Sequence, residues 1–152
     1  MPEEAVIASL SRSLTVPAPL DRVAGYLSDL TTAPEWDPHT AACRRLDTGP
    51  IRVGAQYELT RTFGAYRVAM TVEVREVTDS LITWEGGNEF ATGRETFAFA
   101  AADAGTTVLH TVDVHLRGVA RFGTRLVPGV MRRIADDGTP VLRARLQRLA
   151  VP

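Results

Sequence analysis

Three ionisable side chains, Arg61, Glu95 and His110, have apolar residues as neighbours at alternate positions of the sequence: Leu59, Phe97, and Val108 with Val112. Near neutral pH an imidazole can give or take a proton, and a carboxylate that faces an apolar space must be paired, protonated or bound to a ligand. A guanidinium can supply that pairing and can also stabilise an enolate oxygen. These residue types predict acid–base chemistry by His110 and Glu95, with Arg61 as the partner of Glu95.

Each of these residues also has a structural interpretation. A single histidine on an apolar face is commonly a hydrogen-bonded core residue, and Arg61 with Glu95 can form an ion pair that only holds the fold together. The hydroxyls of Tyr57 and Tyr66 can orient a carbonyl or phenol, or these side chains can fill space. The residues are therefore compatible with a protein that binds a molecule and with one that transforms it.

Composition narrows the chemistry. The 152 residues include no lysine, so no Schiff-base amine is available, and Cys43 is the only cysteine, which excludes an internal disulfide and a thiolate zinc site. The three histidines fall in a loop and on opposite strand faces, so we expect no metal and no cofactor. A net charge of −1 without a basic segment argues against a nucleic-acid partner. No apolar run approaches the roughly 20 residues of a membrane helix, so we expect a cytoplasmic protein without integral membrane contact.

Most of the chain alternates apolar and polar residues, which predicts strands. Residues 5–16 form the first, with Leu10 and Leu14 on its apolar face. Six more are separated by short connections rich in Gly, Asp and Asn, which are typical of hairpins; the segments are 41–47, 55–63, 65–77, 81–88, 91–102 and 105–117.

Alternation also predicts which side chains share the inner face of the sheet. In segment 81–88 the pattern permits either Leu81, Thr83 and Glu85 or Ile82 and Trp84 on that face. In the other segments the inner set includes Tyr57, Leu59, Arg61, Tyr66, Val68, Met70, Val72, Val74, Glu95, Phe97, Phe99, Val108, His110, Val112 and Val114.

Two regions change to helical spacing. After Pro19, apolar residues at 20, 23, 27 and 30 predict a short helix, and the turn-rich stretch 31–38 carries Trp36 as a plug on the core. From Pro128 to Leu149 an apolar stripe predicts one long helix that bends at Pro140, because the stripe keeps its phase across that residue. The pattern is that of one α+β domain over residues 1–152, with a curved antiparallel sheet of about seven strands around the long C-terminal helix.

Three stretches of the chain resemble the START-like helix-grip superfamily, also called SRPBCC, and in particular its polyketide cyclase/dehydrase and lipid-transport branch. They are SLTVPAPLDRVAGYLSDL with EWDP at 35–38, FAFAAADAGTTVLHTVDV at 97–114, and the closing Leu-rich helix to Leu149. The resemblance covers nearly the whole chain and implies a helix-grip fold with short helices after the first strand. Members bind lipids, polyketides or other hydrophobic molecules; some cyclise or dehydrate them, and some sequester them.

A curved sheet cannot close flush on a single helix, so we expect a cavity between them. The preferred interpretation is a monomer or homodimer that binds a hydrophobic or polyketide-like molecule there, in natural-product or lipid metabolism. The alternatives are a cyclase/dehydratase (aromatase) and, from the resemblance, a self-resistance protein that sequesters a reactive natural product. The predicted ligand-binding residues are Tyr57, Leu59, Arg61, Tyr66, Met70, Trp84, Phe97, Phe99, Val112, Met131 and Ile134, with His110 and Glu95 as the catalytic pair.

Overall fold

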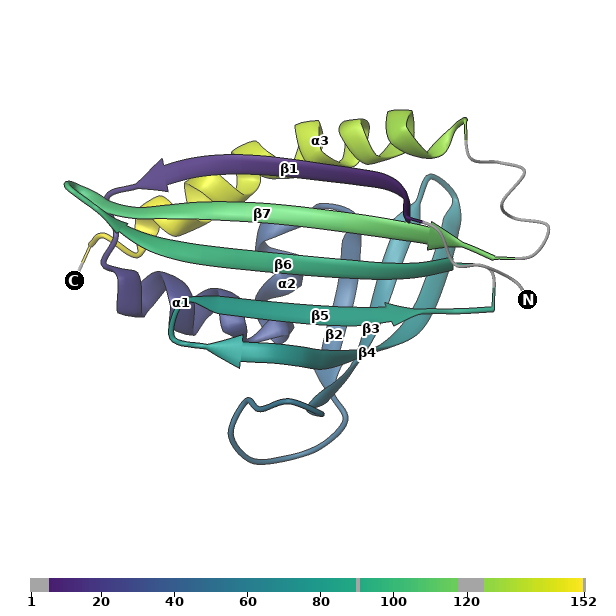
Figure 1. Cartoon of the computed structure of the whole chain (residues 1–152), viewed down its shortest axis with the longest axis horizontal. Coiled ribbons are helices and arrows are strands. Elements are labelled where there is room, and N and C mark those ends of the chain that lie inside the picture. The colour runs from purple at the N-terminus through teal and green to yellow at the C-terminus, as the bar shows by residue number, and fades with distance from the viewer. Residues whose placement is uncertain (1–5, 90, 118–124, 152) are drawn as a thin grey trace.

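A computed structural model describes residues 6–89, 91–117 and 125–151 (Figure 1). Within these ranges one antiparallel sheet of seven strands has the order β1-β7-β6-β5-β4-β3-β2. The strands are β1 (Val6–Val16), β2 (Thr40–Arg45), β3 (Gln56–Phe63), β4 (Tyr66–Thr78), β5 (Leu81–Gly87), β6 (Ala91–Ala102) and β7 (Gly105–Leu116); the helices are α1 (Leu20–Ser28), the 3-10 turn η1 (Leu30–Thr32), α2 (Ala33–Trp36) and α3 (Val127–Arg148).

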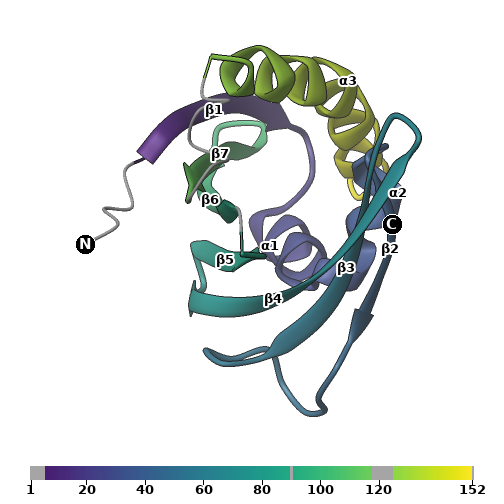
Figure 2. The same ribbon diagram turned by 90° about the vertical axis from the view of Figure 1, so that its right-hand side faces the viewer.

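The sheet curls strongly, and α3 lies across its open side (Figure 2). This arrangement confirms the predicted α+β helix-grip fold, with short helices between the first and second strands. Hairpins join strands that are consecutive in sequence from β2 to β7. The first strand, β1, pairs with the last strand, β7. No helix in the described part of the chain is long and apolar enough to cross a membrane.

The inner face of the sheet carries the core. Segment 81–88, which the sequence left undecided, turns Ile82 and Trp84 inward, and both side chains are almost fully buried. Thr83, on the opposite face, is also buried and shares a hydrogen bond with Thr96 across to β6 (3.0 Å between the hydroxyl oxygens). The other inner-face residues of the core are Leu14, Val16, Tyr57, Leu59, Val72, Val74, Phe97, Phe99 and Val108.

Gly86 of β5 lies close to the backbone of β4. A Cβ atom at this position would stand 2.5 Å from the carbonyl oxygen of Thr71, which no side chain tolerates. At Gly93, its partner on β6, a Cβ would meet only the carbonyl oxygen of Gly86 at 3.8 Å. The close approach of the two backbones therefore requires glycine at position 86. At position 93 there is room for a side chain.

The segment after β1 forms three short pieces. Helix α1 ends at Ser28, two residues earlier than predicted, because the Asp29 side chain accepts a hydrogen bond from the Thr31 backbone N–H and starts the η1 turn. Trp36 ends α2, is buried, and packs edge-on against Phe97 with ring centroids 5.3 Å apart, as its predicted role as a plug requires.

Helix α3 runs unbroken through Pro140, which confirms one helix in place of two. Only part of its apolar stripe is buried: Met131, Leu142 and Leu146 are buried, whereas Val130 and Val141 are exposed. In the described part of the chain, polar side-chain contacts join the helix to the rest of the molecule: Arg12 with Asp136 (2.7 Å), His39 with Asp137 (3.0 Å) and Arg145 with Glu35 (3.6 Å).

Candidate functional site

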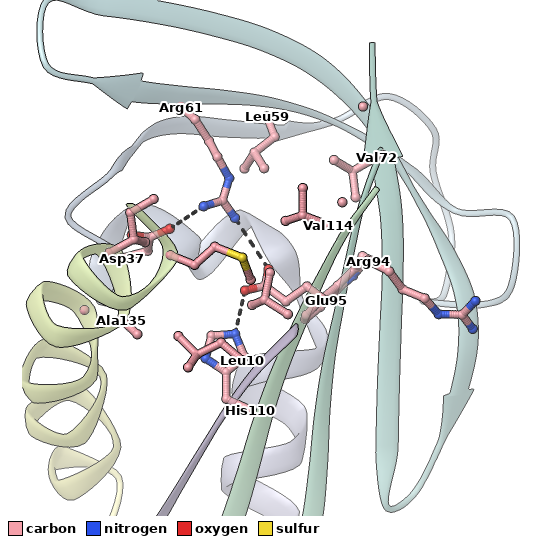
Figure 3. A pocket seen from close by; sticks show the side chains of 18 of the residues that line it. Leu10, Asp37, Leu59, Arg61, Val72, Arg94, Glu95, His110, Val114 and Ala135 are labelled. Carbon is pink, nitrogen blue, oxygen red and sulfur yellow. Dashed lines mark hydrogen bonds and ion pairs between the residues drawn. The ribbon is translucent and has the colours of Figure 1, made fainter. Parts of the chain in front are cut away.

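A cavity of about 370 Å³ lies between the concave face of the sheet and α3 (Figure 3). Pockets of this size accommodate small organic ligands, for which about 300–1,000 Å³ is usual. Most of the lining is apolar and comes from both the sheet and the helix; it includes Leu10, Leu30, Trp36, Leu59, Val68, Met70, Val72, Trp84, Val112, Val114, Val127, Val130, Met131, Ile134, Ala135 and Leu142.

A row of four ionisable side chains crosses one wall of this cavity (Figure 3). Arg61 places Nη1 3.2 Å from Oδ2 of Asp37 and Nη2 3.6 Å from Oε1 of Glu95. The other carboxylate oxygen of Glu95, Oε2, lies 2.6 Å from Nε2 of His110. The structure thus pairs Glu95 with Arg61, as predicted, and adds His110 on the other side of the same carboxylate.

Local structure sets the position of Asp37. Its carboxylate accepts hydrogen bonds from the His39 backbone N–H (2.9 Å) and the Thr40 hydroxyl (2.8 Å), which lock the turn after α2. Thr40 is the register partner of Arg61 between β2 and β3. The turn that closes α2 therefore holds a carboxylate against the guanidinium that β3 directs into the cavity.

The Glu95 carboxyl is ionised at neutral pH. Burial raises its pKa, but the hydrogen bond and the electrostatic interaction with His110, together with the charge of Arg61, outweigh burial and leave the pKa below its ordinary value of 4.5. An ionised carboxylate only accepts hydrogen bonds, so Nε2 of His110 is the donor in the 2.6 Å contact.

The His110 ring is fixed on two sides. It stacks on Phe97 with centroids 4.2 Å apart and planes inclined by 18°, while Glu95 holds Nε2. In the neutral form of the ring, Nδ1 carries a lone pair that can accept a proton. A histidine oriented by a carboxylate, with a guanidinium nearby and an apolar space beside it, can move a proton to or from a bound molecule.

Most of the predicted site residues line the cavity. They are Leu59, Arg61, Met70, Trp84, Glu95, His110, Val112, Met131 and Ile134. Segments far apart in sequence meet there, because β3 to β7 present one continuous concave face and α3 covers it. Among the described residues no group of three His, Cys, Asp or Glu side chains converges as a metal site.

Four predicted ligand-binding residues lie elsewhere. Tyr66 is 76% exposed because it sits at the tip of the β3–β4 hairpin, beyond the end of the cavity. Tyr57 is fully buried in the core, where burial raises the pKa of its hydroxyl to about 12. Phe97 and Phe99 are also buried outside the lining, with Phe97 serving as the support for His110. Inward direction alone does not place a residue at the cavity, since the same face also packs the core.

Asp37 and Arg12 also line the cavity, although neither is among the predicted site residues. Asp37 belongs to the EWDP motif, which carried the family resemblance, but the sequence gives no sign of its contact with Arg61. Arg12 lies in β1 at the same parity as Leu10 and Leu14, and that parity was a signal, because a charged residue on an apolar strand face needs a reason. The register pairs Arg12 with His110 across β1 and β7, so both belong to one transverse row of the sheet.

Comparisons with known proteins agree with this architecture. The family model described as polyketide cyclase/dehydrase and lipid transport matches residues 8–150. No curated protein matches the sequence. Similar solved structures include the Zhui aromatase/cyclase from Streptomyces sp. R1128, with 16% identity, a TM-score of 0.73 and coverage of 93% of each chain.

Two further structures have the same fold. The protein TTHA0849 from Thermus thermophilus has 14% identity and a TM-score of 0.73, with coverage of 95% of this chain and 97% of that one. The di-domain ARO/CYC protein StfQ from the steffimycin biosynthetic pathway has 12% identity and a TM-score of 0.72 over 93% of this chain. This chain spans about half of StfQ, 51% of its length.

Proposed function

This chain belongs to the polyketide cyclase/dehydrase and lipid transport family, and from that premise we propose that its cavity binds a hydrophobic, polyketide-like small molecule. The observation that carries the proposal is the cavity of about 370 Å³ with an apolar lining and one charged wall. Apolar surface supplies affinity for a ring system, and a few fixed polar groups orient its oxygens. Arg61 can donate to a carbonyl or phenolate, and His110 can donate or accept.

The binding proposal is tested with 1,8-dihydroxyanthraquinone, a flat tricyclic compound with carbonyl and phenol groups. Both tryptophans, Trp36 and Trp84, line the cavity, so binding is expected to quench their fluorescence. Val112→Phe fills the cavity and is expected to weaken binding at least about tenfold, as the loss of about 1.4 kcal/mol of contacts would. A matched control is Leu109→Phe, on the opposite face of β7, where the side chain is 43% exposed. Equal affinity in both variants would contradict binding in the cavity.

The His110–Glu95 pair favours a second candidate function, a cyclase/dehydratase of the aromatase type that needs no cofactor. In this reaction Nδ1 of neutral His110 takes the proton alpha to a ligand carbonyl; the C–H bond breaks and its electron pair forms an enolate. Arg61 stabilises the enolate oxygen. For dehydration, the beta C–O bond breaks and the imidazolium returns its proton to the departing hydroxyl as water. For cyclisation, the enolate attacks a second carbonyl, and the new alkoxide takes that proton.

A turnover assay distinguishes the enzyme hypothesis from the binding-protein hypothesis. The β-hydroxy ketone 4-hydroxy-4-phenylbutan-2-one loses water to a conjugated enone, which ultraviolet absorbance detects. An enzyme is expected to lose about 10²–10⁴-fold in rate with His110→Ala, and to lose rate also with Glu95→Gln, while Leu109→Phe keeps its rate. Binding of the anthraquinone without turnover of this substrate would support storage or sequestration, including self-resistance.

The setting of this activity is also part of the proposal. We expect a cytoplasmic monomer or homodimer that acts on a small molecule in lipid or natural-product metabolism, without a nucleic-acid partner. The net charge of −1 supports the last point, because nucleic-acid binding relies on excess positive charge. Light scattering of the purified chain measures the oligomeric state, and a salt-dependent shift with duplex DNA would contradict the expected partner class.

A further inference from the structure

A second hollow, a surface groove, lies between β1 and α3 on the outside of the cavity. Its walls come from Arg12 on the strand and from one face of the helix; the helix residues are Asp136, Thr139, Pro140, Arg143, Ala144 and Gln147. Arg12 and Thr139 line both the groove and the internal cavity. The two hollows therefore meet at this junction, and the guanidinium of Arg12 stands between them.

The guanidinium of Arg12 is incompletely paired. Its Nη2 donates to Oδ1 of Asp136 at 2.7 Å, but its Nε is buried and has no hydrogen-bond partner among the described residues. A buried donor without an acceptor calls for an explanation, and a ligand atom is one. The present partner is weakly held, since the Asp136 side chain is 64% exposed and ion pairs in water contribute little.

The groove carries an excess of positive charge. Arg12 and Arg143 face a single carboxylate, that of Asp136, so the ionisable groups of the groove sum to +1. Arg143 has no ion-pair partner in the described part of the chain. Arg61, another arginine of the cavity wall, differs in this respect, because Asp37 and Glu95 both lie against it. A ligand carboxylate is therefore favoured more at Arg12 than at Arg61, where two carboxylates already lie.

We propose that the junction of β1 and α3 is a subsite for a carboxylate on the cavity ligand, with Arg12 as its main contact. This inference rests on the proposed function and names its ligand class: an amphipathic acid, with the apolar ring system in the cavity and the carboxylate at the groove. The carboxylate binds side-on to Nε and Nη2 of Arg12, in the two-pronged geometry that guanidinium and carboxylate favour. Asp136 then turns toward solvent, and Arg143 adds a second positive charge.

Two isosteric probes test this subsite: anthraquinone-2-carboxylate and the neutral anthraquinone-2-carboxamide. Fluorescence titration of the native chain is expected to give about tenfold tighter binding of the carboxylate, the value of one charge-assisted hydrogen bond. Added salt is expected to reduce this preference, because the site is partly open to solvent. The affinity for the carboxamide reports binding of the ring system in the cavity. The ratio of the carboxylate affinity to the carboxamide affinity reports the contribution of the subsite.

Three variants test which residue causes the preference for the carboxylate over the carboxamide. Arg12→Leu is expected to bring the ratio to about one. Asp136→Asn removes the competing carboxylate and is expected to raise the ratio, a gain that damaged folding cannot produce. Arg44→Leu is the matched control, an arginine in an exposed ion pair with Glu58 on the far edge of the sheet, and both affinities are expected to stay unchanged.

Each other outcome would overturn the proposal. Equal affinities in the native chain would show that no anion subsite exists, and a ratio that survives Arg12→Leu would place the carboxylate elsewhere. Loss of amide binding in Arg12→Leu would make the arginine a structural residue. Failure of both probes to bind the native chain would refute the proposed function together with the subsite, whereas amide binding without preference would refute only the subsite.

Discussion

Glu95 and His110 show how one carboxylate can organise a site. Glu95 contacts His110 on one side and Arg61 on the other, and each contact orients a group that faces the cavity. The same contacts keep the carboxylate charged although it is buried. A buried charge of this kind links the stability of the fold to pH.

The pH dependence follows from the direction of the pKa shift. The folded-state pKa of Glu95 lies below its ordinary value of 4.5, so its contribution to stability is fully present above that value and is lost as the pH falls through the folded-state pKa. Glu95→Gln is expected to lower the free energy of unfolding by about 1.5–3 kcal/mol at neutral pH. The deficit relative to the native chain is expected to shrink in acid, as urea unfolding between about pH 3 and 7 would measure.

The control for this prediction is Glu58→Gln. Glu58 pairs with Arg44 at 3.1 Å on the exposed face, where the loss of an ion pair is expected to cost at most about 1 kcal/mol. If the deficit of Glu95→Gln stayed constant down to the acid end of the range, Glu95 would not be ionised in the folded state as described.

At the scale of elements, β4 and β5 approach each other closely at Gly86. Gly86→Ala is expected to destabilise the fold by about 1–3 kcal/mol, since the added methyl group would meet the Thr71 carbonyl oxygen at 2.5 Å. Gly93→Ala, one strand away, adds the same methyl group in free space and is expected to leave stability unchanged or raise it by about 0.4–1 kcal/mol. Thermal unfolding of the two variants compares them, and equal losses would be inconsistent with the described backbone approach.

The burial pattern of α3 leads to a second prediction at this scale. Leu142 is buried in the core while the adjacent Val141 is exposed. Leu142→Ala is expected to cost about 2–5 kcal/mol of unfolding free energy. Val141→Ala is expected to change it by only about 0.5 kcal/mol. Denaturant unfolding measures both, and a reversed order would mean that the helix is rotated about its axis relative to the structure.

For the whole molecule, the cavity couples ligand binding to stability. The lining comes from β1 at one edge of the sheet, from β3 to β7 and from α3, so a bound molecule contacts parts of the chain that separate on unfolding. A ligand that binds only the folded chain stabilises it by about 2.7 kcal/mol at one hundred times its dissociation constant. We expect 1,8-dihydroxyanthraquinone to raise the melting temperature of the native chain accordingly.

Hydrogen exchange distinguishes this effect from binding at the surface. Amides of α3 and of β3, β6 and β7 are expected to gain protection together when the cavity is filled. The variant Val112→Phe is expected to melt at a temperature that the compound does not change. Protection confined to a single edge strand would point to a site outside the cavity.

Much of the architecture was encoded locally. Strand alternation determined that Arg61, Glu95 and His110 face the interior, and helical spacing together with the unbroken phase across Pro140 determined one long C-terminal helix. These patterns are short in range and depend only on the geometry of a strand or helix, so they can be read without knowledge of the partners.

Tertiary structure decided which inward residues reach the cavity and which fill the core. Phe97 and Arg61 both face inward, but Arg61 lines the cavity and Phe97 does not, because Trp36 and His110 pack against the Phe97 ring. The contacts of Asp37 with Arg61 and of Arg12 with Asp136 join residues that are 24 and 124 positions apart. Alternation assigns a side chain to a face but carries no information on distance between elements, and only the packed chain supplies it.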